Sequence, residues 1–413
     1  MSQVSAAGEL GRVDVNLADP ATFADPGIED VWRRLRREQP VFRHPATRHG
    51  PAFWVLTRYT DVLSVYRDAE TFSSARGNML TSLLDGGDNA GGKLLAVTDP
   101  PRHTAVRMLL LRSFSPRVLK PVLQAVRQRA DRLVGAAVDA GRCDFAPAVA
   151  DQLPIGTICD LLGVPPTDHA ELLRLSKQAL SSDEPDAPAH ETWLARNEIL
   201  LYFRGLIEKR RADPREDVVS ALALGEVDGA PLSLEEAVLN CYGLILAGDE
   251  TSRLAMIGAV WNFIQFPDQW RALRDGEVAL ETAVEEILRW NSPAMHLGRT
   301  ARRDVTIRGE LIRAGELVTV WNASANRDEE VFADPDTFQL ARTPNKHLTF
   351  GHGPHFCLGA FLGRAEVTAV VDALRRQVVE IAAVGEPRPV YSTFLRGFSS
   401  LPVAFTPSGS GTG

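Results

Sequence analysis

A single long apolar helix is the feature that most limits how this chain can fold. Ser233 and Glu236 have the spacing of a capping box, which predicts that a helix starts there. The apolar pattern then continues to Phe266, and Pro267 ends the helix or begins the next one. At about 1.5 Å per residue, such a helix is roughly 50 Å long, so it must run through the interior of the molecule.

The middle of that helix contains residues that are unfavourable inside a buried helix. It reads Ala247-Gly248-Asp249-Glu250-Thr251. A glycine inside a helix costs about 1 kcal/mol relative to alanine, and burying an acidic pair is costly unless both carboxyls are satisfied. A local violation in an otherwise consistent element is typical of a functional site.

The rest of the chain predicts a mainly α protein with a smaller β-rich region. Further helices are predicted at Thr60–Asp68, Pro116–Ala140, Asp168–Leu180, Glu191–Ala212, Leu280–Trp290 and Ala360–Val379. Short β-rich runs predict strands at Phe53–Thr57, Asp304–Ile307, Leu317–Trp321 and Pro402–Phe405. No linker divides the chain, so we expect one domain over residues 21–407, with a flexible segment at 1–20 and a flexible tail at 408–413.

Composition excludes several functional classes. Forty-five Lys and Arg against 53 Asp and Glu give a net charge of −8, which argues against binding to a nucleic-acid backbone. The longest nearly apolar run, Leu254–Ile264, is short of the roughly 18–20 residues that span a bilayer, and residues 1–26 lack a signal segment. The cysteines form no CxxC pair and stand at Cys143, Cys159, Cys241 and Cys357. We therefore expect a cytoplasmic protein with reduced thiols and no membrane or nucleic-acid partner.

The densest chemical signal is the run Phe350–Gly359, which reads FGHGPHFCLG. Its glycines permit an unusual backbone, and Cys357 stands directly before a predicted helix. The free N–H groups and the positive end of a helix dipole lower the pKa of a thiol and stabilise a thiolate. A thiolate held in this way is either a nucleophile or a metal ligand.

Three interpretations of Cys357 remain open on these residues. It could be a small buried apolar side chain. It could join His347, His352 and His355 in a zinc site, although the spacing fits no known finger and leaves the glycines unexplained. It could also be the axial thiolate of a haem iron.

The run Phe350–Gly359 resembles the haem-binding signature FGxGxHxCxG of the cytochrome P-450 family, with every fixed position matched. The resemblance extends from about Phe23 to Phe405. It implies the cytochrome P-450 fold and a haem b whose iron is held by Cys357, with Phe350 and Gly359 in the haem-binding segment. It also implies a monooxygenase that inserts one oxygen atom from O₂ into a C–H bond of an apolar small molecule.

Two further motifs follow in the order that the family has them. Glu286 and Arg289 resemble its ExxR element and share one helix face, and Arg342 matches the arginine that joins this pair. The resemblance implies a structural role for these three. Ala247–Thr251 resembles the family's (A/G)GxxT element.

The (A/G)GxxT resemblance also implies roles for single residues. Thr251 and Glu250 would relay the protons that O–O cleavage needs. Ala247 and Gly248 would make room for O₂. Asp249 is expected to face away and form a structural ion pair.

The resemblance also implies contacts with the haem and the substrate. The haem propionates would be bound by His103 and Arg107, which are spaced i,i+4 on a helix, by Arg299 after a Leu297–Gly298 turn, and by His355. A mainly apolar pocket would be lined by Leu95, Val97, Leu246, Ala247, Met295, His296, Phe394 and Leu395. His296 is either its polar anchor or an ordinary core or solvated histidine. Ser73–Lys93 and Leu180–Trp193 resemble the mobile segments over the substrate entrance.

The resemblance is to the bacterial, soluble members of the family, which receive electrons from separate proteins. It implies electrons from NAD(P)H through a ferredoxin reductase and a ferredoxin, which would dock on the thiolate side near arginines such as Arg364. We expect a monomer that acts in secondary-metabolite tailoring, by hydroxylation or by epoxidation or oxidative coupling. The alternatives are a haem protein that binds a gas or ligand without turnover, and a zinc-site protein that uses His352, His355 and Cys357.

Overall fold

The structure is a computed structural model that describes residues 15–25, 27–114, 116–180 and 189–409. Most of the predicted flexible ends, and residues 181–188 of the predicted entrance segment, lie outside these ranges. The helices are α1 (Ala21–Ala24), α2 (Ile28–Glu38), α3 (Tyr59–Arg67), α4 (Leu80–Leu84), α5 (Arg102–Ser113), α6 (Pro116–Asp139), α7 (Gln152–Leu162), α8 (His169–Leu180), α9 (Ala189–Ala212), α10 (Val218–Leu224), α11 (Leu234–Gln265), α12 (Pro267–Arg274), α13 (Leu280–Asn291), α14 (Asn322–Ala325) and α15 (Ala360–Gln377). Short helical turns are η1 (Leu95–Val97), η2 (Ala146–Ala150), η3 (Pro166–Asp168) and η4 (Gly353–His355).

The strands form one larger sheet and several small ones. They are β1 (Val41–His44), β2 (Phe53–Leu56), β3 (Phe72–Ser73), β4 (Arg142–Asp144), β5 (Glu226–Val227), β6 (Ala230–Pro231), β7 (His296–Ala301), β8 (Val305–Ile307), β9 (Glu310–Ile312), β10 (Leu317–Trp321), β11 (Val378–Ala383), β12 (Arg388–Pro389), β13 (Phe398–Ser400) and β14 (Pro402–Pro407). The largest sheet has the order β1-β2-β10-β7-β3, and only the β2–β10 pair is parallel.

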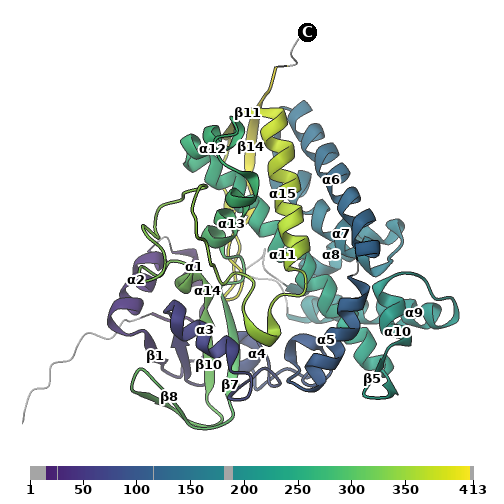
Figure 1. The fold of residues 1–413 in the computed structure, drawn as a ribbon, viewed down its shortest axis with the longest axis vertical. Helices are drawn as coiled ribbons and strands as arrows, with labels where there is room; N and C mark the ends of the chain where they lie inside the picture. Colours follow the sequence, from purple (N-terminus) through teal and green to yellow (C-terminus); the bar gives the residue numbers. More distant parts are fainter. Residues whose placement is uncertain (1–14, 26, 115, 181–188, 410–413) are drawn as a thin grey trace, which may run out of the picture.

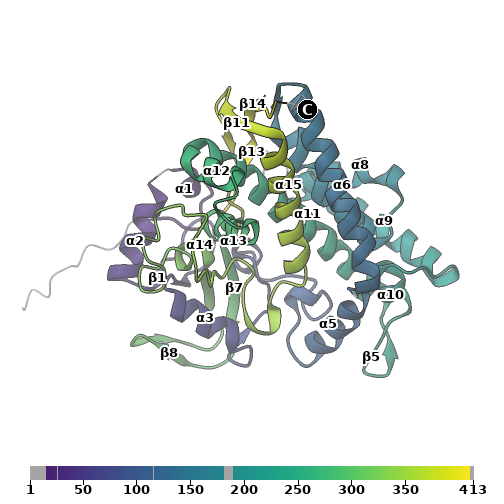
Figure 2. The ribbon, with the colours of Figure 1, turned by 45° about the horizontal axis from the view of Figure 1, so that its top comes forward.

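The helices and the large sheet occupy different parts of the molecule. Helices α6, α7, α11 and α15 gather in one part, and the sheet with α2 and α3 forms the other (Figure 1). A second sheet, with the order β11-β14-β4, lies at the C-terminal end of α15 in both ribbon views (Figure 2). The predicted mainly α fold with a smaller β-rich region is therefore confirmed.

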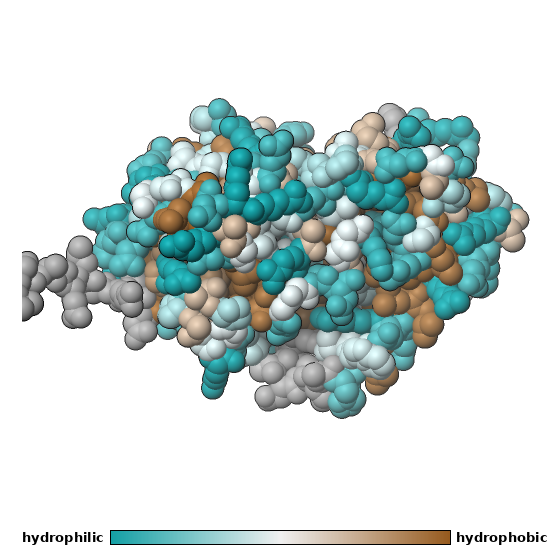
Figure 3. Space-filling view, turned by 90° about the horizontal axis from the view of Figure 1, so that it is seen from below, coloured by the Kyte–Doolittle hydropathy of each residue, from teal (hydrophilic) through white to brown (hydrophobic). Residues whose placement is uncertain are grey.

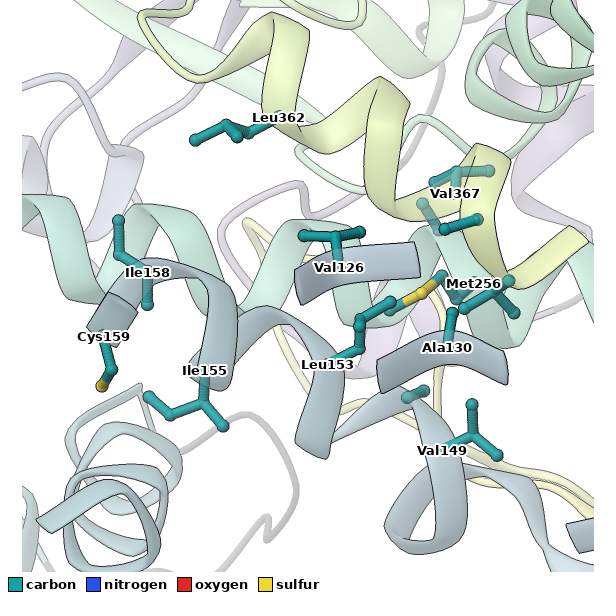
Figure 4. Packing of buried hydrophobic residues seen from close by; sticks show 14 of the residues in the cluster. Val126, Ala130, Val149, Leu153, Ile155, Ile158, Cys159, Met256, Leu362 and Val367 are labelled. Atoms are coloured by element: carbon teal, nitrogen blue, oxygen red, sulfur yellow. The ribbon is translucent and has the colours of Figure 1, made fainter. Parts of the chain in front are cut away.

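The predicted central helix is present as α11. Its capping box is complete, because Ser233 Oγ accepts the Glu236 N–H at 3.1 Å and Glu236 Oε2 accepts the Ser233 N–H at 3.0 Å. Helix α11 packs against α7, α9, α13 and α15, so its apolar surface is covered on several sides. Figure 4 shows the side chains at this crossing, where Met256 of α11 lies near Leu153 of α7.

A predicted turn and a predicted helix end are wrong for reasons of tertiary structure. Leu297 and Gly298 form no turn, because they pair with Val320 and Thr319 inside strand β7. Helix α15 ends at Gln377 rather than Val379, since Val378 pairs with β14 at the start of β11.

A buried carboxyl lies where four helices meet. Glu366 of α15 is 2% exposed, and its carboxyl is in hydrogen-bond contact with the hydroxyls of Ser252 on α11 and Thr157 on α7. Burial raises the pKa of Glu366 to about 7, although these hydroxyls and the Arg129 guanidinium on α6 act against the rise. The carboxyl is thus harder to ionise in the folded protein than in the unfolded chain.

We expect Glu366→Gln to change how stability depends on pH. The raised pKa means that the unfolded chain loses this proton first, so wild-type stability falls between about pH 4.5 and 7 by up to about 3 kcal/mol. The variant lacks this loss, so its free energy of unfolding relative to wild type should rise up to pH 7 and stay level above it. Urea unfolding at several pH values measures the difference. The exposed Glu380→Gln should show no such trend, and a flat difference for Glu366→Gln would contradict the prediction.

Candidate active site

The loop before Cys357 has a backbone that only glycine adopts easily. Gly351 and Gly353 have φ angles of 66° and 70°. A Cβ at Gly353 would lie 2.2 Å from the carbonyl oxygen of Tyr66, so any other residue would push the loop away from α3. The Cys357 N–H donates to the Phe350 carbonyl at 2.9 Å, which closes the loop before α15 begins. These contacts fix the shape of the backbone that carries Cys357.

The Cys357 side chain lines a space inside the molecule. Protein atoms surround this cysteine on nearly all sides, but its surface is still accessible to solvent. Burial raises the pKa of the Cys357 thiol, whereas the Gly359 N–H, Arg107 and Arg364 act in the opposite direction. The Gly359 N–H at the start of the helix lowers this pKa as expected, but burial outweighs it, so the net shift is upward. A metal cation at the sulfur would reverse the balance, because coordination deprotonates a thiol.

A buried cluster of charges anchors the chain that leads to this loop. Glu286 accepts from Arg289 at 2.7 and 2.8 Å and from Arg342 at 3.1 Å, and all three side chains are almost completely buried. Arg289 also donates to the Asn326 carbonyl at 2.7 Å, and the Asn326 side chain accepts the Leu348 N–H at 2.6 Å. The cluster thus connects α13 to the residues just before the Cys357 loop. This is the pairing that the sequence predicted.

Four basic side chains meet beside the Cys357 loop. The ring centroids of His103 on α5 and His355 lie 4.1 Å apart. Burial and the charges of Arg107 and Arg299 lower the pKa of His103 to about 4 and that of His355 to about 3. Neither nitrogen of His103, nor Nε2 of His355, has a hydrogen-bond partner within the part of the chain that the structure describes. The structure therefore brings together all four residues that the sequence assigned to one anionic group.

These residues fit a haem with its two propionates. The acid whose charge acts on His103 and His355 is Asp99, and its carboxylate is already bound by Ser73, the Ser74 N–H and Arg302. Two carboxylates of a ligand would supply the missing acceptors and counter-charge. The accessible Cys357 sulfur supplies a ligand for its iron.

Helix α11 presents small residues and a hydroxyl to this interior space. Ala247 is exposed and Thr251, one turn further along, is half-buried. Residues 252–260, which follow on the same helix, are buried. The Thr251 hydroxyl donates to the Ala247 carbonyl at 3.3 Å. Gly248 has a different place from the expected one, since a Cβ there would lie 3.0 Å from Ile158 of α7. Its small size lets α7 approach, so the idea that it makes room for O₂ is not supported.

The ion pair expected for Asp249 is formed by its neighbour Glu250 instead. Arg253 donates to the Glu250 carboxylate at 2.8 and 3.1 Å, so Glu250 is the acid in an ion pair. Arg253 also pairs with Asp151 at 3.4 Å, and Asp151 binds Lys177 of α8. Asp249 is fully buried, and neither of its oxygens has a hydrogen-bond partner among the described residues. Burial and the Glu250 charge raise the pKa of Asp249 well above its usual range.

The residues expected to line a substrate pocket divide into two groups. Leu95, Leu246 and Phe394 are partly exposed, whereas the buried ones are Val97, Met295, His296 and Leu395.

His296 belongs to the core. Its Nε2 accepts the Leu80 N–H at 3.1 Å, its ring lies 4.5 Å from that of Trp321, and burial lowers its pKa to about 3. Of the two readings of His296, the polar anchor is therefore wrong.

Some functional candidates were missed from the sequence. Arg253 stands three residues after Glu250, so its spacing could have predicted the ion pair. Asp151 lies far from the motifs in the sequence and gave no such signal. Two surface hollows, one between α5 and α10 and one beside β1, are lined by none of the candidate site residues.

Two further observations concern metal-binding clusters and membrane-spanning helices. Within the described ranges, no three His, Cys, Asp or Glu side chains are placed to hold a metal ion. No helix in those ranges is long and apolar enough to cross a membrane. The face seen in Figure 3 mixes polar and apolar residues.

The chain is similar to proteins of one family. The model of the family described as Cytochrome P450 matches residues 278–405. Cytochrome P450 NovI of Streptomyces niveus is 49% identical over 398 residues, which cover 96% of this chain and 97% of that protein. The methyl-branched lipid omega-hydroxylase of Mycobacterium tuberculosis strain H37Rv is 36% identical, over 96% of this chain and 94% of its own.

Solved structures agree with these relatives. P450 OxyD, which is involved in the biosynthesis of vancomycin-type antibiotics, has a TM-score of 0.87 and 34% identity, over 95% of this chain and 100% of its own. Mycobacterium marinum CYP268A2, solved in complex with pseudoionone, has a TM-score of 0.87 and 32% identity, over 95% and 98%. With a 49% identical relative matched along almost all of its length, this chain belongs to the cytochrome P450 family and is a haem-thiolate monooxygenase.

Proposed function

We propose that Cys357 holds the haem iron and that this monooxygenase tailors an apolar small molecule in secondary metabolism. The observation that carries the proposal is the group of four basic residues, with unsatisfied buried nitrogens, beside an accessible cysteine. When bound, the haem supplies the activation of O₂ and the insertion of one oxygen atom into a C–H bond. The protein residues would bind the haem, orient the substrate and deliver protons.

The basic group would bind the haem propionates. His103 and His355 would donate hydrogen bonds to the propionates, and the charges of Arg107 and Arg299 would balance theirs, which is favourable in a site with little water. Arg299 is almost completely buried and lies 5.8 Å from the Tyr66 ring, so its guanidinium is held in place before the ligand binds. Phe350 packs under the Arg364 guanidinium at 4.4 Å and supports the Cys357 loop.

We assign proton delivery to Thr251 and Glu250. Thr251 borders the interior space, and Glu250 is the next residue on the same helix. From Glu250, ion pairs continue through Arg253 and Asp151 to Lys177, whose side chain is 28% exposed. This chain of polar groups runs from the partly exposed Lys177 to Glu250, the residue next to Thr251 in the sequence. Protons would enter along it, with water as a carrier.

The relatives suggest the substrate class. One is a lipid omega-hydroxylase and another is a P450 involved in the biosynthesis of vancomycin-type antibiotics. We infer hydroxylation of an apolar metabolite, with epoxidation or oxidative coupling as related outcomes.

Electrons would come from NAD(P)H through a ferredoxin reductase and a ferredoxin to the monomeric enzyme. We place the docking surface on the Cys357 side, where Met108, Phe356 and Phe361 are exposed. Arg364 was expected to attract the partner there. However, it donates to Glu285 at 2.6 and 2.9 Å, so its charge is already balanced.

Replacing Cys357 tests the iron ligand. In the wild type, the ferrous protein with carbon monoxide should show the strongly red-shifted Soret band of a thiolate-bound haem. Cys357→Ser should lose that band, because a neutral hydroxyl cannot replace the thiolate. Cys143→Ser, at a half-buried cysteine on β4, should keep it. A Cys357→Ser protein that retains the band would remove Cys357 as the ligand.

Replacing Thr251 tests proton delivery. In Thr251→Ala, the product formed per NAD(P)H oxidised should fall about tenfold, with hydrogen peroxide released instead, because the hydroxyl that passes protons is missing. NAD(P)H consumption, peroxide release and product formation are measured in parallel, with a redox partner pair supplied. Thr306→Ala, on the exposed strand β8, is the matched control. Unchanged coupling in Thr251→Ala would exclude its hydroxyl from the relay.

A further inference from the structure

The segment of residues 93–98, just before α5, is fastened to α11 by one buried side chain. Asn240 is 1% exposed. Its Oδ1 accepts the Leu95 N–H at 3.0 Å, and its Nδ2 donates to the Lys93 carbonyl at 2.9 Å. A third bond, from Nδ2 to the Glu236 carbonyl at 2.8 Å, orients the amide on its own helix. Two of the three bonds thus hold the segment against α11, and the third fixes the direction of the amide.

A glycine on the same helix completes the contact. A Cβ at Gly243 would lie 2.4 Å from Cδ1 of Leu94, so a larger residue there would push the leucine side chain aside. Lys93 also pairs with Glu235 at 2.8 Å, but both side chains are well exposed and this pair adds little. The attachment therefore depends on Asn240 and Gly243.

Hydrogen bonds within the segment hold its residues together as one unit. The Thr98 hydroxyl donates to the Leu94 carbonyl at 2.7 Å, and the Gly92 N–H donates to the Val97 carbonyl at 2.8 Å. These bonds close a turn around η1. Asn240 holds this turn at one point, so its position along α11 sets the position of the whole turn.

The attachment lies close to the interior face of α11. Positions 240, 243, 247 and 251 recur at three- and four-residue spacing, so they follow one stripe of the helix. Ala247 is four to seven residues beyond the attachment, which is about 6–10 Å along the helix axis. The turn with the partly exposed Leu95 and the exposed Ala96 is therefore attached to the same stripe of α11 that carries Ala247.

We propose that Asn240 is a positioning residue for substrate selection: it holds residues 93–98 as a fixed wall of the substrate pocket. The inference rests on the proposed function, since it assumes that the space before Ala247 receives the substrate. A fixed wall selects ligands by size because it cannot retreat without breaking two hydrogen bonds to the Asn240 amide. Without that amide, the wall can move away from α11 and accept larger ligands.

The test compares wild type, Asn240→Ala and a matched control, Asn262→Ala, as haem-loaded full-length proteins. Asn262 is also a buried asparagine of α11, and its Nδ2 donates to Asn291 Oδ1 at 3.2 Å, away from the wall. The first measurement is hydrogen exchange in a peptide covering residues 93–98. Exchange should become about tenfold faster in Asn240→Ala, because the Leu95 N–H loses its acceptor, and should stay unchanged in Asn262→Ala.

The second measurement is ligand selectivity, followed by the Soret shift. Imidazole is the small probe and clotrimazole the bulky one. Relative to imidazole, clotrimazole should bind about fivefold more tightly to Asn240→Ala than to wild type, with no change in Asn262→Ala. Gly243→Ala is a second variant that displaces Leu94 directly. It should also alter the selectivity, and it serves if Asn240→Ala does not fold.

Each outcome decides the proposal. Faster exchange together with altered selectivity supports it. Unchanged exchange, unchanged selectivity, or equal effects in Asn262→Ala would overturn it. A wild type without the thiolate-haem spectrum would overturn the proposed function and this inference together. A wild type with that spectrum and with selectivity that Asn240→Ala leaves intact would overturn this inference alone.

Discussion

The ion cluster of Glu286, Arg289 and Arg342 is the interaction on which the site depends. A carboxylate so completely buried is stable only when its partners are held in place, and removal of one partner from such a cluster typically costs about 3–5 kcal/mol. Through Asn326 the cluster fixes the chain that enters the Cys357 loop. The loop itself has little regular structure, so its shape comes from the cluster at one end and from α15 at the other. The position of the thiol is therefore set by charges that take no part in the reaction.

The parts of the fold that local signals determine could be predicted from the sequence. Helix α11 is one example, because its capping box and terminal proline mark both ends. Helix α7 was missed because Pro154 stands inside it. That proline lies in the first turn, where its missing N–H costs nothing. The strand at Leu297–Gly298 was missed for a different reason, since only pairing with β10 makes this segment extended. Such pairing joins residues distant in sequence and leaves no local pattern.

The site could be predicted as a set of residues but less well as an arrangement. Spacing and family resemblance brought His103 and His355 to one place, and the structure has them there. They could not decide which of two adjacent acids is paired, because the answer depends on where Arg253 and the neighbouring helices lie. They also gave the wrong direction for the pKa of Cys357, since burial outweighs the helix terminus. In each case the missing information was the surroundings of a side chain rather than its identity.

The basic group around His103 and His355 also affects how the protein is assembled. Arg107 and Arg299 are like charges brought together in a dry environment, so their repulsion weakens the contact between α5 and the Cys357 loop. A dianionic ligand converts that repulsion into attraction. Haem binding would therefore stabilise the folded protein, because a ligand that binds only the folded state shifts the folding equilibrium towards it. Cofactor supply during synthesis would then limit the yield of correctly packed protein as well as its activity.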